Sequence, residues 1–583
     1  MPPPEKLYIL LLYIQRLAPG RNFEHLDSLG IMTLAAFLED KGYRARTYTG
    51  ITTDALRVAE EEIGRENLGA IGLTCDYDNQ SAVISFARAI KGRHRIPIIV
   101  GGPQAFHLRS GFLREARCDF LIKGDGEQAL FELLECLGEG RDPSASIAGL
   151  TCFDRDGVER ENPPRPPGRN LDGRPFPRTR YRLRPGKRRA LSVIGSRGCP
   201  YRCSFCFEGG NTKRFRPRSV GDVMAEIRLG LEENPEARYL MFQDDTFTQQ
   251  PDRTLAFARE LAALRRTRDF VWFCEAHPGF LVRHPEVLPE MIGAGLQRMQ
   301  IGFESGCRGT LDQYRKGISP EQLREAVRLC WDAGLPQLAG NFIIGGPGEE
   351  ERTLTTTRDF ILEILNGFPG MLDLSTTFIN PLPNTEITRQ PEKFGMIITD
   401  PEMCTSLEDY PVNETLSLDR VAICRARRNM VEAISATMKR QYAEGLIPAG
   451  RMKRHFELAL RYGVSSSWFN YVFSRDEVCM SYHTLLLFTS ARGIDEVRPE
   501  ELESAFPLRV ADPEGIGPGR GSRLGALLSA DDRRILGACD GKTRLDALAA
   551  LFSGRSGASA VPPDPFLSRI DDLSRRRWLV FFH

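Results

Sequence analysis

The stretch GCPYRCSFC, residues 198–206, carries three cysteines spaced C-x3-C-x2-C and directly follows a predicted apolar strand. Three thiolates in one short loop can face a common centre, as an iron–sulfur cluster or a zinc site requires. A set of three protein ligands leaves one metal position open, and an open iron can bind and activate a small molecule. Cys199, Cys203 and Cys206 are therefore predicted to be metal ligands.

Two other interpretations of these cysteines stay open at this point. They can be small buried apolar side chains, or a zinc site that a distant His or Cys completes, although none of the eight histidines lies within the loop. The remaining cysteines of the 14 in the chain are scattered singly. This is not the density of a disulfide scaffold, and thiols in a large cytosolic protein stay reduced.

The sequence around the cysteines alternates apolar strands with helical segments over residues 188–395. Such alternation predicts parallel strands with helical crossovers, here a partial (β/α)6 barrel in which the loop after each strand can carry function. The predicted strands are Ala190–Ile194, Tyr239–Gln243, Val271–Phe273, Met299–Phe303, Asn341–Ile344 and Asp373–Ile379.

Residues 1–145 show the same alternation and predict a separate, doubly wound Rossmann-like domain with a parallel sheet. The loops after its strands are rich in glycine and small polar residues, and in open parallel sheets such loops hold the ligand. The chain is therefore predicted to be an α/β protein. The predicted strands of this domain are Leu7–Tyr13, Ala70–Thr74, Pro97–Val100 and Phe120–Lys123.

Three further segments complete the predicted organisation. Residues 146–187 are rich in Pro, Gly and Arg and are predicted to be a linker. Residues 396–510 are predicted to be mainly helical and to lie on the substrate side. Residues 524–583 follow a boundary rich in Gly and Pro and are predicted to form a small winged-helix-like domain.

Length and charge narrow the class of protein. With 583 residues the chain is too long for a single core. Its 78 Lys and Arg residues balance 77 Asp and Glu residues, which argues against a general nucleic-acid binder and against an acidic disordered chain. The longest apolar stretch near the start, Leu7–Ile14, is far shorter than the ~20 residues of a membrane helix. We expect a cytoplasmic protein without a membrane partner.

The cysteine spacing, with an aromatic residue directly before the last cysteine, resembles the signature of the radical S-adenosylmethionine (SAM) family. The resemblance covers roughly residues 188–390. It implies a [4Fe-4S] cluster on Cys199, Cys203 and Cys206, with Phe205 at the cofactor site and SAM chelating the fourth iron. It also implies an external electron donor of the flavodoxin or ferredoxin type and a 5′-deoxyadenosyl radical, chemistry that belongs to the cofactor.

Three other stretches resemble SAM-binding segments of that family. Asp244 or Asp245, after the second barrel strand, would bind the SAM amino group, although the family usually has Gly-Gly-Glu there. Glu304 lies in the stretch GFES, which resembles the G-x-E-S of the larger barrel subgroup. Gly345 and Gly346 lie in a Gly-rich loop whose backbone would pass close to adenine and ribose. The alternative for the acidic residues is solvated carboxylates at strand ends.

The N-terminal domain, placed ahead of such a barrel, resembles the cobalamin-binding domain of the cobalamin-dependent radical SAM class. The resemblance rests on VGGPQA at residues 100–105 and on KGDGE at residues 123–127, where the usual motif is G-E-G-E. The motif D-x-H-x-x-G, which supplies a histidine to cobalt in some cobalamin proteins, does not occur. Neither His25 nor His107 is therefore expected to bind cobalt. The cofactor-binding residues that the resemblance implies are Thr74, Gly101, Gly102, Gly124, Gly126 and Glu127.

The resemblance implies C-methylation of an unactivated carbon in a natural-product or peptide substrate, by way of the 5′-deoxyadenosyl radical and methylcobalamin. Cyclisation or rearrangement without methyl transfer, a non-enzymatic iron–sulfur protein and a tRNA-modifying enzyme are the alternatives. Residues 525–583 are also similar to the winged-helix leader-peptide-binding modules of the type found in pyrroloquinoline quinone biosynthesis. That similarity predicts peptide binding by strand addition to a sheet edge, with a structural cap as the alternative.

Overall fold

The computed structural model describes residues 7–583 except 16–27, 66–67, 78, 109–110, 184–188, 208–213, 401–409, 512–527 and 554–563. The chain folds into two compact units. One comprises Met1–Ile361 with Ser375–Val431, and the other comprises Leu362–Leu374 with Glu432–His583. Among the described helices, none is both long enough and apolar enough to cross a membrane.

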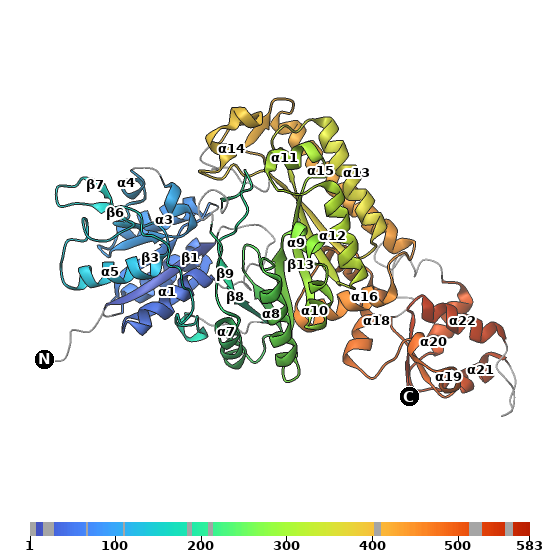
Figure 1. Cartoon of the computed structure of the whole chain (residues 1–583). Helices are drawn as coiled ribbons and strands as arrows, with labels where there is room; N and C mark the ends of the chain where they lie inside the picture. The colour runs from blue at the N-terminus through green and yellow to red at the C-terminus, as the bar shows by residue number, and fades with distance from the viewer. Residues whose placement is uncertain are drawn as a thin grey trace. The chain divides into compact units, whose positions relative to one another are not determined.

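The first unit begins with a seven-stranded sheet between two layers of helices, in the order β2-β1-β3-β4-β5-β6-β7 (Figure 1). Alternate residues of its interior strand β1 face opposite layers: Ile9 and Leu11 pack with α1 and α5, whereas Leu10 and Leu12 pack with α2, α3 and α4. Because both faces are covered, the strand is apolar throughout. The elements are β1 (Tyr8–Gln15), α1 (Leu29–Asp40), β2 (Arg44–Ile51), α2 (Thr52–Ile63), β3 (Leu68–Thr74), α3 (Gln80–Lys91), β4 (Ile98–Gly101), α4 (Phe112–Ala116), β5 (Phe120–Ile122), α5 (Gly126–Gly138), β6 (Leu150–Phe153) and β7 (Glu159–Glu161).

The predicted linker at 146–187 requires a correction. It contains β6 and β7, which pair antiparallel with the edge of the N-terminal sheet, so that the sheet continues beyond residue 145. A tight turn joins the two strands because the Asp154 carboxylate accepts hydrogen bonds from the N–H groups of Asp156 and Val158, at 3.0 and 2.9 Å. The first part of the segment is therefore sheet, and the linker is shorter than predicted.

A second sheet, most of which belongs to the first unit, forms an open barrel of six strands in the order β15-β14-β13-β12-β11-β8 (Figure 1). Neighbouring strands from β8 to β14 pair in parallel, and each predicted strand is present. The strands are β8 (Ala190–Val193), β11 (Tyr239–Phe242), β12 (Val271–Ala276), β13 (Leu296–Glu304), β14 (Gln337–Ile344) and β15 (Leu372–Phe378). The helices between them are α7 (Val220–Glu233), α8 (Pro251–Arg265), α9 (Pro278–Arg283), α10 (Val287–Gly293), α11 (Arg308–Tyr314), α12 (Pro320–Asp332) and α13 (Glu351–Gly367).

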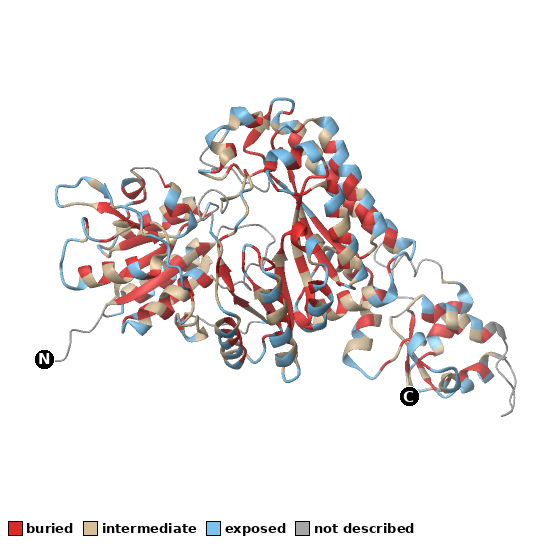
Figure 2. Ribbon diagram, in the orientation of Figure 1, coloured by how far each residue is buried: buried red, intermediate tan, exposed pale blue. Residues whose placement is uncertain are grey.

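The two faces of the barrel strands differ in chemistry. On the helical side, Phe303 and Phe342 stack at 5.1 Å between ring centroids, and both lie against Phe360 of α13. Trp272 likewise lies among aromatic rings on that side. Figure 2 shows the strands as largely buried ribbons beneath partly exposed helices. Since successive side chains of a strand alternate, the residues between these aromatics line the inner face.

Beyond β15 the chain is mainly helical, as predicted, and short strands interrupt it. The elements are α14 (Glu386–Arg389), β16 (Met396–Ile398), β17 (Asn413–Thr415), α15 (Arg420–Ala443), α16 (Ala449–Glu457), α17 (Ser467–Tyr471), α18 (Glu477–Phe488), α19 (Pro499–Leu502), β18 (Phe506–Arg509), α20 (Ala530–Ala538), α21 (Leu545–Ser553), α22 (Asp564–Arg575) and β19 (Leu579–Phe582).

The C-terminal sheet bears on the predicted peptide-binding module. β18 pairs with β19, so the module includes residues before the predicted start at 524. At the outer edge of β18 the Arg509 N–H donates to the Cys539 carbonyl at 3.1 Å, and the Pro507 carbonyl accepts from the Gly541 N–H at 2.9 Å. Arg492 exchanges both backbone hydrogen bonds with Phe581 of β19, each at 2.9 Å. These bonds occupy backbone groups on which an added strand would pair. Strand addition therefore gains no support from this sheet, and peptide binding by the module stays a prediction.

The core of this module generates a stability prediction. Trp578 is fully buried among residues of α20, α21 and α22. We expect Trp578→Ala to lower the free energy of unfolding of the C-terminal unit by about 3–5 kcal/mol, because the lost ring leaves a cavity. Leu551→Ala is the matched control, since Leu551 is 72% exposed, and it should change stability by less than about 0.5 kcal/mol. Calorimetric unfolding of the full chain measures both, and equal shifts would contradict the assignment of Trp578 to the core.

Candidate active site

A short antiparallel pairing closes the loop that carries the three cysteines. Ser196–Arg197 (β9) pairs with Arg216–Pro217 (β10), so the chain leaves the end of β8, passes the cysteines and returns beside its starting point. The pairing places charged side chains at both ends of the loop, next to the predicted metal ligands. The loop thus begins after the carboxyl end of the first barrel strand and is closed at its base by the pairing of β9 with β10.

Asp244 anchors the start of this loop. Its carboxylate accepts hydrogen bonds from the Gly195 N–H at 2.8 Å and from the Ser196 hydroxyl. Arg253 completes the anchor by donating to the Gly195 carbonyl at 2.6 Å. Asp244 is 2% exposed, and this burial raises its pKa to about 6. Both oxygens of this predicted SAM ligand are therefore engaged by the protein.

Asp245, the next residue, has a different setting. It is exposed and lies close enough to Cys199 for its charge to act on that thiol. Of the two adjacent carboxylates that the sequence leaves undecided, Asp245 is the one presented beside the cysteine loop. Binding of the SAM amino group by Asp245 stays a prediction.

Packing fixes the middle of the loop on the barrel. The Ser204 N–H donates to the carbonyl of Tyr314 at 3.0 Å, and the Phe205 ring meets the Tyr314 ring edge-on at 5.0 Å. Tyr201 stacks on His277, with ring centroids 3.8 Å apart and planes 12° apart. The aromatic residue of the cysteine signature thus anchors the loop, whatever else it contacts when cofactor is bound.

His277 is held in one tautomer. Its Nδ1 accepts from the Gly279 N–H at 3.1 Å, so the ring proton lies on Nε2, which donates to the Lys316 carbonyl at 3.2 Å. Burial and the positive charge of Lys316 lower the pKa of His277 to about 3. The ring is consequently neutral and serves as a flat support for Tyr201.

A buried ion pair lies behind the thiols. Lys316 donates to Glu304 at 2.7 Å, and both side chains are about nine-tenths buried. Burial alone would lower the pKa of Lys316, but the ion pair and hydrogen bond with Glu304, together with the nearby Cys203 and Cys206 sulfurs, hold that pKa above its usual value. Glu304 has φ +59, a strained value for a side-chain-bearing residue that is typical of functional sites.

The thiols themselves are the donor set that an iron–sulfur cluster needs. Cys199, Cys203 and Cys206 are partly exposed and lie close enough to influence one another electrostatically. Burial raises the pKa of Cys199 to about 12 and that of Cys203 to about 11. Cys199 and Cys203 therefore keep their protons near neutral pH until a metal binds them, since a coordinated thiol is deprotonated outright.

Within the described ranges, no group of three or more His, Cys, Asp or Glu side chains is arranged to hold a metal ion. A [4Fe-4S] cluster makes a different demand, because each thiolate binds a separate iron and the sulfur atoms need not meet at one point. Three thiols on one loop, with the charge of Lys316 beside them, fit that demand.

The Gly-rich loop after β14 is held by a residue that sequence reasoning missed. The buried Glu349 carboxylate accepts from the N–H groups of Gly345 and Gly346 at 2.6 and 3.1 Å. Glycine is required at 346 because a Cβ there would lie 1.8 Å from the Tyr314 hydroxyl, and Gly345 has φ +83. The backbone of this loop thus requires glycine because of contacts and torsion angles within the protein. Its contact with adenine and ribose stays a prediction.

A belt of polar side chains lines the inner face of the barrel, and the sequence prediction did not include it. Gln300 donates to Glu275 on the neighbouring strand at 3.2 Å. Asn341 donates to Thr377 at 2.8 Å and accepts from Ser375 at 3.0 Å. Burial raises the pKa of Glu275 to about 7. The sequence signal that could have indicated this belt is the presence of polar residues at alternate positions of otherwise apolar strands.

In the N-terminal domain, the predicted cofactor residues lie at the carboxyl ends of neighbouring strands. Thr74 ends β3, and Gly101 ends β4. Gly102 has φ +100, and a Cβ there would lie 2.6 Å from the Cys75 carbonyl. Asn79, absent from the prediction, is buried and donates to the carbonyls of Thr74 and Ile14, both at 3.0 Å. The structure thus brings this part of the predicted set together at one sheet edge.

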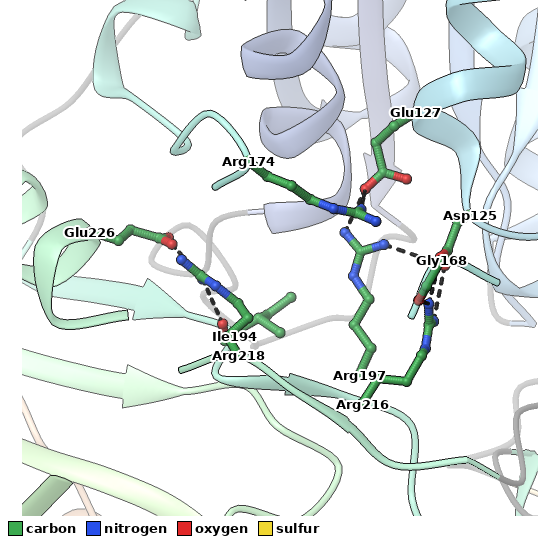
Figure 3. Close-up of polar contacts among 9 residues, drawn as sticks. All are labelled: Asp125, Glu127, Gly168, Arg174, Ile194, Arg197, Arg216, Arg218 and Glu226. Atoms are coloured by element: carbon green, nitrogen blue, oxygen red, sulfur yellow. Dashed lines mark hydrogen bonds and ion pairs between the residues drawn. The ribbon is translucent and has the colours of Figure 1, made fainter. Parts of the chain in front are cut away.

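The turn after β5 completes that edge and reaches the barrel. Gly124 has φ +101, and Gly126 begins α5. The carboxylate of Glu127 is engaged by Arg174 and Arg197 (Figure 3). This predicted cofactor residue therefore has arginine partners within the protein. Of the two histidines considered for cobalt, His25 lies outside the described residues.

Comparison with known proteins agrees with both predicted cofactor domains. Residues 24–134 match the B12 binding domain, and residues 193–361 match the radical SAM superfamily. The chain is 29% identical over 326 residues to an uncharacterised methyltransferase of Pyrococcus horikoshii, covering 54% of this chain and 68% of the relative. It is 25% identical over 338 residues to an anaerobic magnesium-protoporphyrin IX monomethyl ester cyclase of Rubrivivax gelatinosus, covering 56% of this chain and 60% of the relative.

A solved structure shares the fold. The radical SAM methyltransferase TsrM of Kitasatospora setae, determined with cobalamin and a [4Fe-4S] cluster bound, superposes with a TM-score of 0.60 at 18% identity. The match covers 83% of this chain and all of TsrM.

The chain therefore carries a radical SAM domain behind an N-terminal B12-binding domain, the two domains of a cobalamin-dependent radical SAM enzyme. Its radical SAM domain implies a [4Fe-4S] cluster and SAM, and its B12-binding domain implies cobalamin. Enzymes of this kind also require a reductant.

The two adjacent carboxylates give a paired prediction. Asp244→Ala leaves the buried Gly195 N–H without its acceptor, which should cost about 1–3 kcal/mol and lower the iron content after anaerobic reconstitution. Asp245→Asn should keep full iron content and weaken SAM binding, measured by equilibrium dialysis. Loss of iron in Asp245→Asn together with full iron in Asp244→Ala would reverse these roles.

Proposed function

We propose that the protein is a methyltransferase that adds a methyl group to an unactivated carbon of a polar natural product or peptide. The observation that carries the proposal is the contact between the cysteine loop and the loops that follow β4 and β5 of the B12-binding domain. The cysteine loop contacts the B12-binding domain through Phe207, whose ring meets His107 edge-on at 5.1 Å, and through Arg197 and Arg216. A cluster held by the cysteine loop and a cobalamin held by the B12-binding domain would therefore both lie next to the same bound substrate.

The residues of this chain divide the tasks at the radical SAM site. Cys199, Cys203 and Cys206 would hold the cluster, and Asp245 would accept hydrogen bonds from the SAM amino group. Lys316 keeps a positive charge beside the thiolates and orients Glu304. When bound, the cluster and SAM supply a 5′-deoxyadenosyl radical, and cobalamin supplies the methyl group.

The edge of the B12-binding domain suits a flat, largely apolar ring. Tyr77 and Phe106, in the segments after β3 and β4, are 41% and 43% exposed. Gly102 and Gly124 add backbone without side chains at the same edge, both with φ near +100. Aromatic surface beside bare backbone favours binding of a macrocycle such as the corrin ring of cobalamin.

The polar belt favours a hydrophilic substrate. Glu275, Gln300, Asn341, Ser375 and Thr377 offer hydrogen-bond donors and acceptors on the inner face of the barrel. A hydrocarbon placed there would leave the remaining hydrogen-bonding capacity of these groups unused and shield it from water, which is costly. A peptide or a polar natural product would satisfy them.

A second candidate function is cyclisation without methyl transfer. It is favoured by the similarity to the cyclase of Rubrivivax gelatinosus, whose reaction closes a ring on a porphyrin ester according to its name. The same cofactor loops would serve both reactions. The two differ in the fate of the SAM methyl group, which isotopic labelling follows directly.

The first test is anaerobic reconstitution with iron, sulfide, cobalamin and a flavodoxin reductant, using SAM labelled with deuterium in its methyl group. We expect 5′-deoxyadenosine and a product that carries the label. The Cys199→Ala, Cys203→Ala, Cys206→Ala triple variant should lose iron and 5′-deoxyadenosine yet retain cobalamin, which serves as the folding control. An unlabelled, cyclised product would replace methyl transfer by the second candidate, and four irons in the triple variant would refute the ligand assignment.

A further prediction follows from the missing D-x-H-x-x-G motif. The electron paramagnetic resonance spectrum of the bound cob(II)alamin should lack nitrogen superhyperfine splitting from a protein imidazole. His107 has a different role in the structure, where its ring contacts Phe207. A splitting that disappears in His107→Ala or His25→Ala would contradict the expectation.

A further inference from the structure

Two carboxylates of the B12-binding domain point to the barrel. Asp125 is the N-cap residue of α5, and Glu127 lies in the first turn of that helix. Asp125 accepts two hydrogen bonds from Arg216, at 2.6 and 3.1 Å, and lies 3.3 Å from Arg197. Glu127 accepts from Arg197 at 2.7 Å and also pairs with Arg174. Figure 3 shows the arginines converging on these two side chains.

The arginines are placed at both ends of the cysteine loop. Arg197 in β9 precedes Cys199 by two residues, and Arg216 in β10 closes the loop on its return. Since β9 and β10 pair with each other, a force on either arginine is transmitted to the base of the whole loop. The carboxylates thus hold the loop at its two ends rather than at one exposed point.

The contacts are buried and directional. The side chains of Glu127 and Arg216 are each 7% exposed. Arg216 binds Asp125 through two guanidinium nitrogens and donates to the Gly168 carbonyl at 2.9 Å. A paired fork of this kind fixes orientation as well as distance, which a single surface charge pair does not.

An aromatic contact acts on the same loop independently. Phe207 directly follows the predicted ligand Cys206, and its ring meets His107 of the B12-binding domain at 5.1 Å. His107 ends the short helix Pro103–His107 after β4, whereas Asp125 follows β5. Two neighbouring loops of the predicted cobalamin edge therefore contact the cysteine loop.

We propose that Asp125 and Glu127 are positioning residues that bind the cysteine loop through Arg197 and Arg216 and thereby set the separation between cobalt and the iron–sulfur cluster. The inference rests on the proposed function for the presence of both cofactors. It reassigns Glu127 from direct cofactor binding to a contact between domains. Transfer of a methyl group to a substrate radical requires both reacting centres within reach of one carbon, so their separation must be held.

The test compares Asp125→Asn, Glu127→Gln, Arg216→Gln and the Asp125→Asn, Arg216→Gln double variant with the parent chain. Hydrogen exchange of the apoprotein should rise at residues 195–207 and 214–218 in each single variant, with little further rise in the double variant. In the reconstituted protein, cobalamin and iron contents should stay equal to those of the parent. The distance between cob(II)alamin and the reduced cluster, measured by pulsed dipolar spectroscopy, should become broader.

Controls separate this role from simple loss of charge. Arg228→Gln removes an exposed ion pair with Glu260 in the same unit and should change neither readout. Asp125→Glu keeps the carboxylate and should restore a narrow distance distribution. Should Arg216→Gln fail to fold, Arg216→Lys keeps the charge without the two-nitrogen fork and supplies the same comparison.

The outcomes are distinct. Loss of cobalamin from Asp125→Asn and Glu127→Gln, with unchanged exchange in the cysteine loop, would mean that the carboxylates bind the cofactor and would overturn the proposal. Unchanged exchange and an unchanged distance distribution would overturn it as well. Failure of the parent chain to bind cobalamin would instead refute the proposed function, while hydrogen exchange would still test the contact between the loops.

Discussion

The pairing of Ser196–Arg197 with Arg216–Pro217 is the constraint on which the site depends. It closes the cysteine loop at its base, so that one anchor serves all three thiols. Asp244 and Arg253 attach that base to the barrel through Gly195, and Asp125 attaches it to the B12-binding domain. Without the closure, these anchors would act on separate strands and could not fix the loop.

Several buried or partly buried charges around the loop lie opposite a charge of the other sign. Glu304 faces Lys316, and Asp125 and Glu127 face Arg197 and Arg216. A buried charge is tolerated only with a partner, so each pair admits few arrangements of its two side chains. Such pairs contribute orientation more than stability. Their position around the thiols matches a site whose function depends on geometry.

The folds of both cofactor domains were largely predictable, because the alternation of apolar strands with amphipathic helices depends on residues that are close together in the sequence. The exceptions have physical reasons. β2 has the sequence RARTYTGI, whose polar residues hide its strand character. β6 and β7 lie in a segment rich in Pro and Arg, where composition outweighs the turn signal at Asp154. The belt around Glu275 and Gln300 escaped prediction because its residues lie on different strands.

The sequence by itself predicted the cluster ligands, since Cys199, Cys203 and Cys206 share one short loop with the spacing of the radical SAM signature. It also determined the order of the cofactor domains. Only the tertiary structure distinguishes the settings of Asp244, whose carboxylate anchors the loop, and Asp245, which lies close enough to act on Cys199. It likewise gave Glu127 its arginine partners. A side chain's role depends on neighbours that are distant in sequence, and only folding brings them within hydrogen-bonding distance.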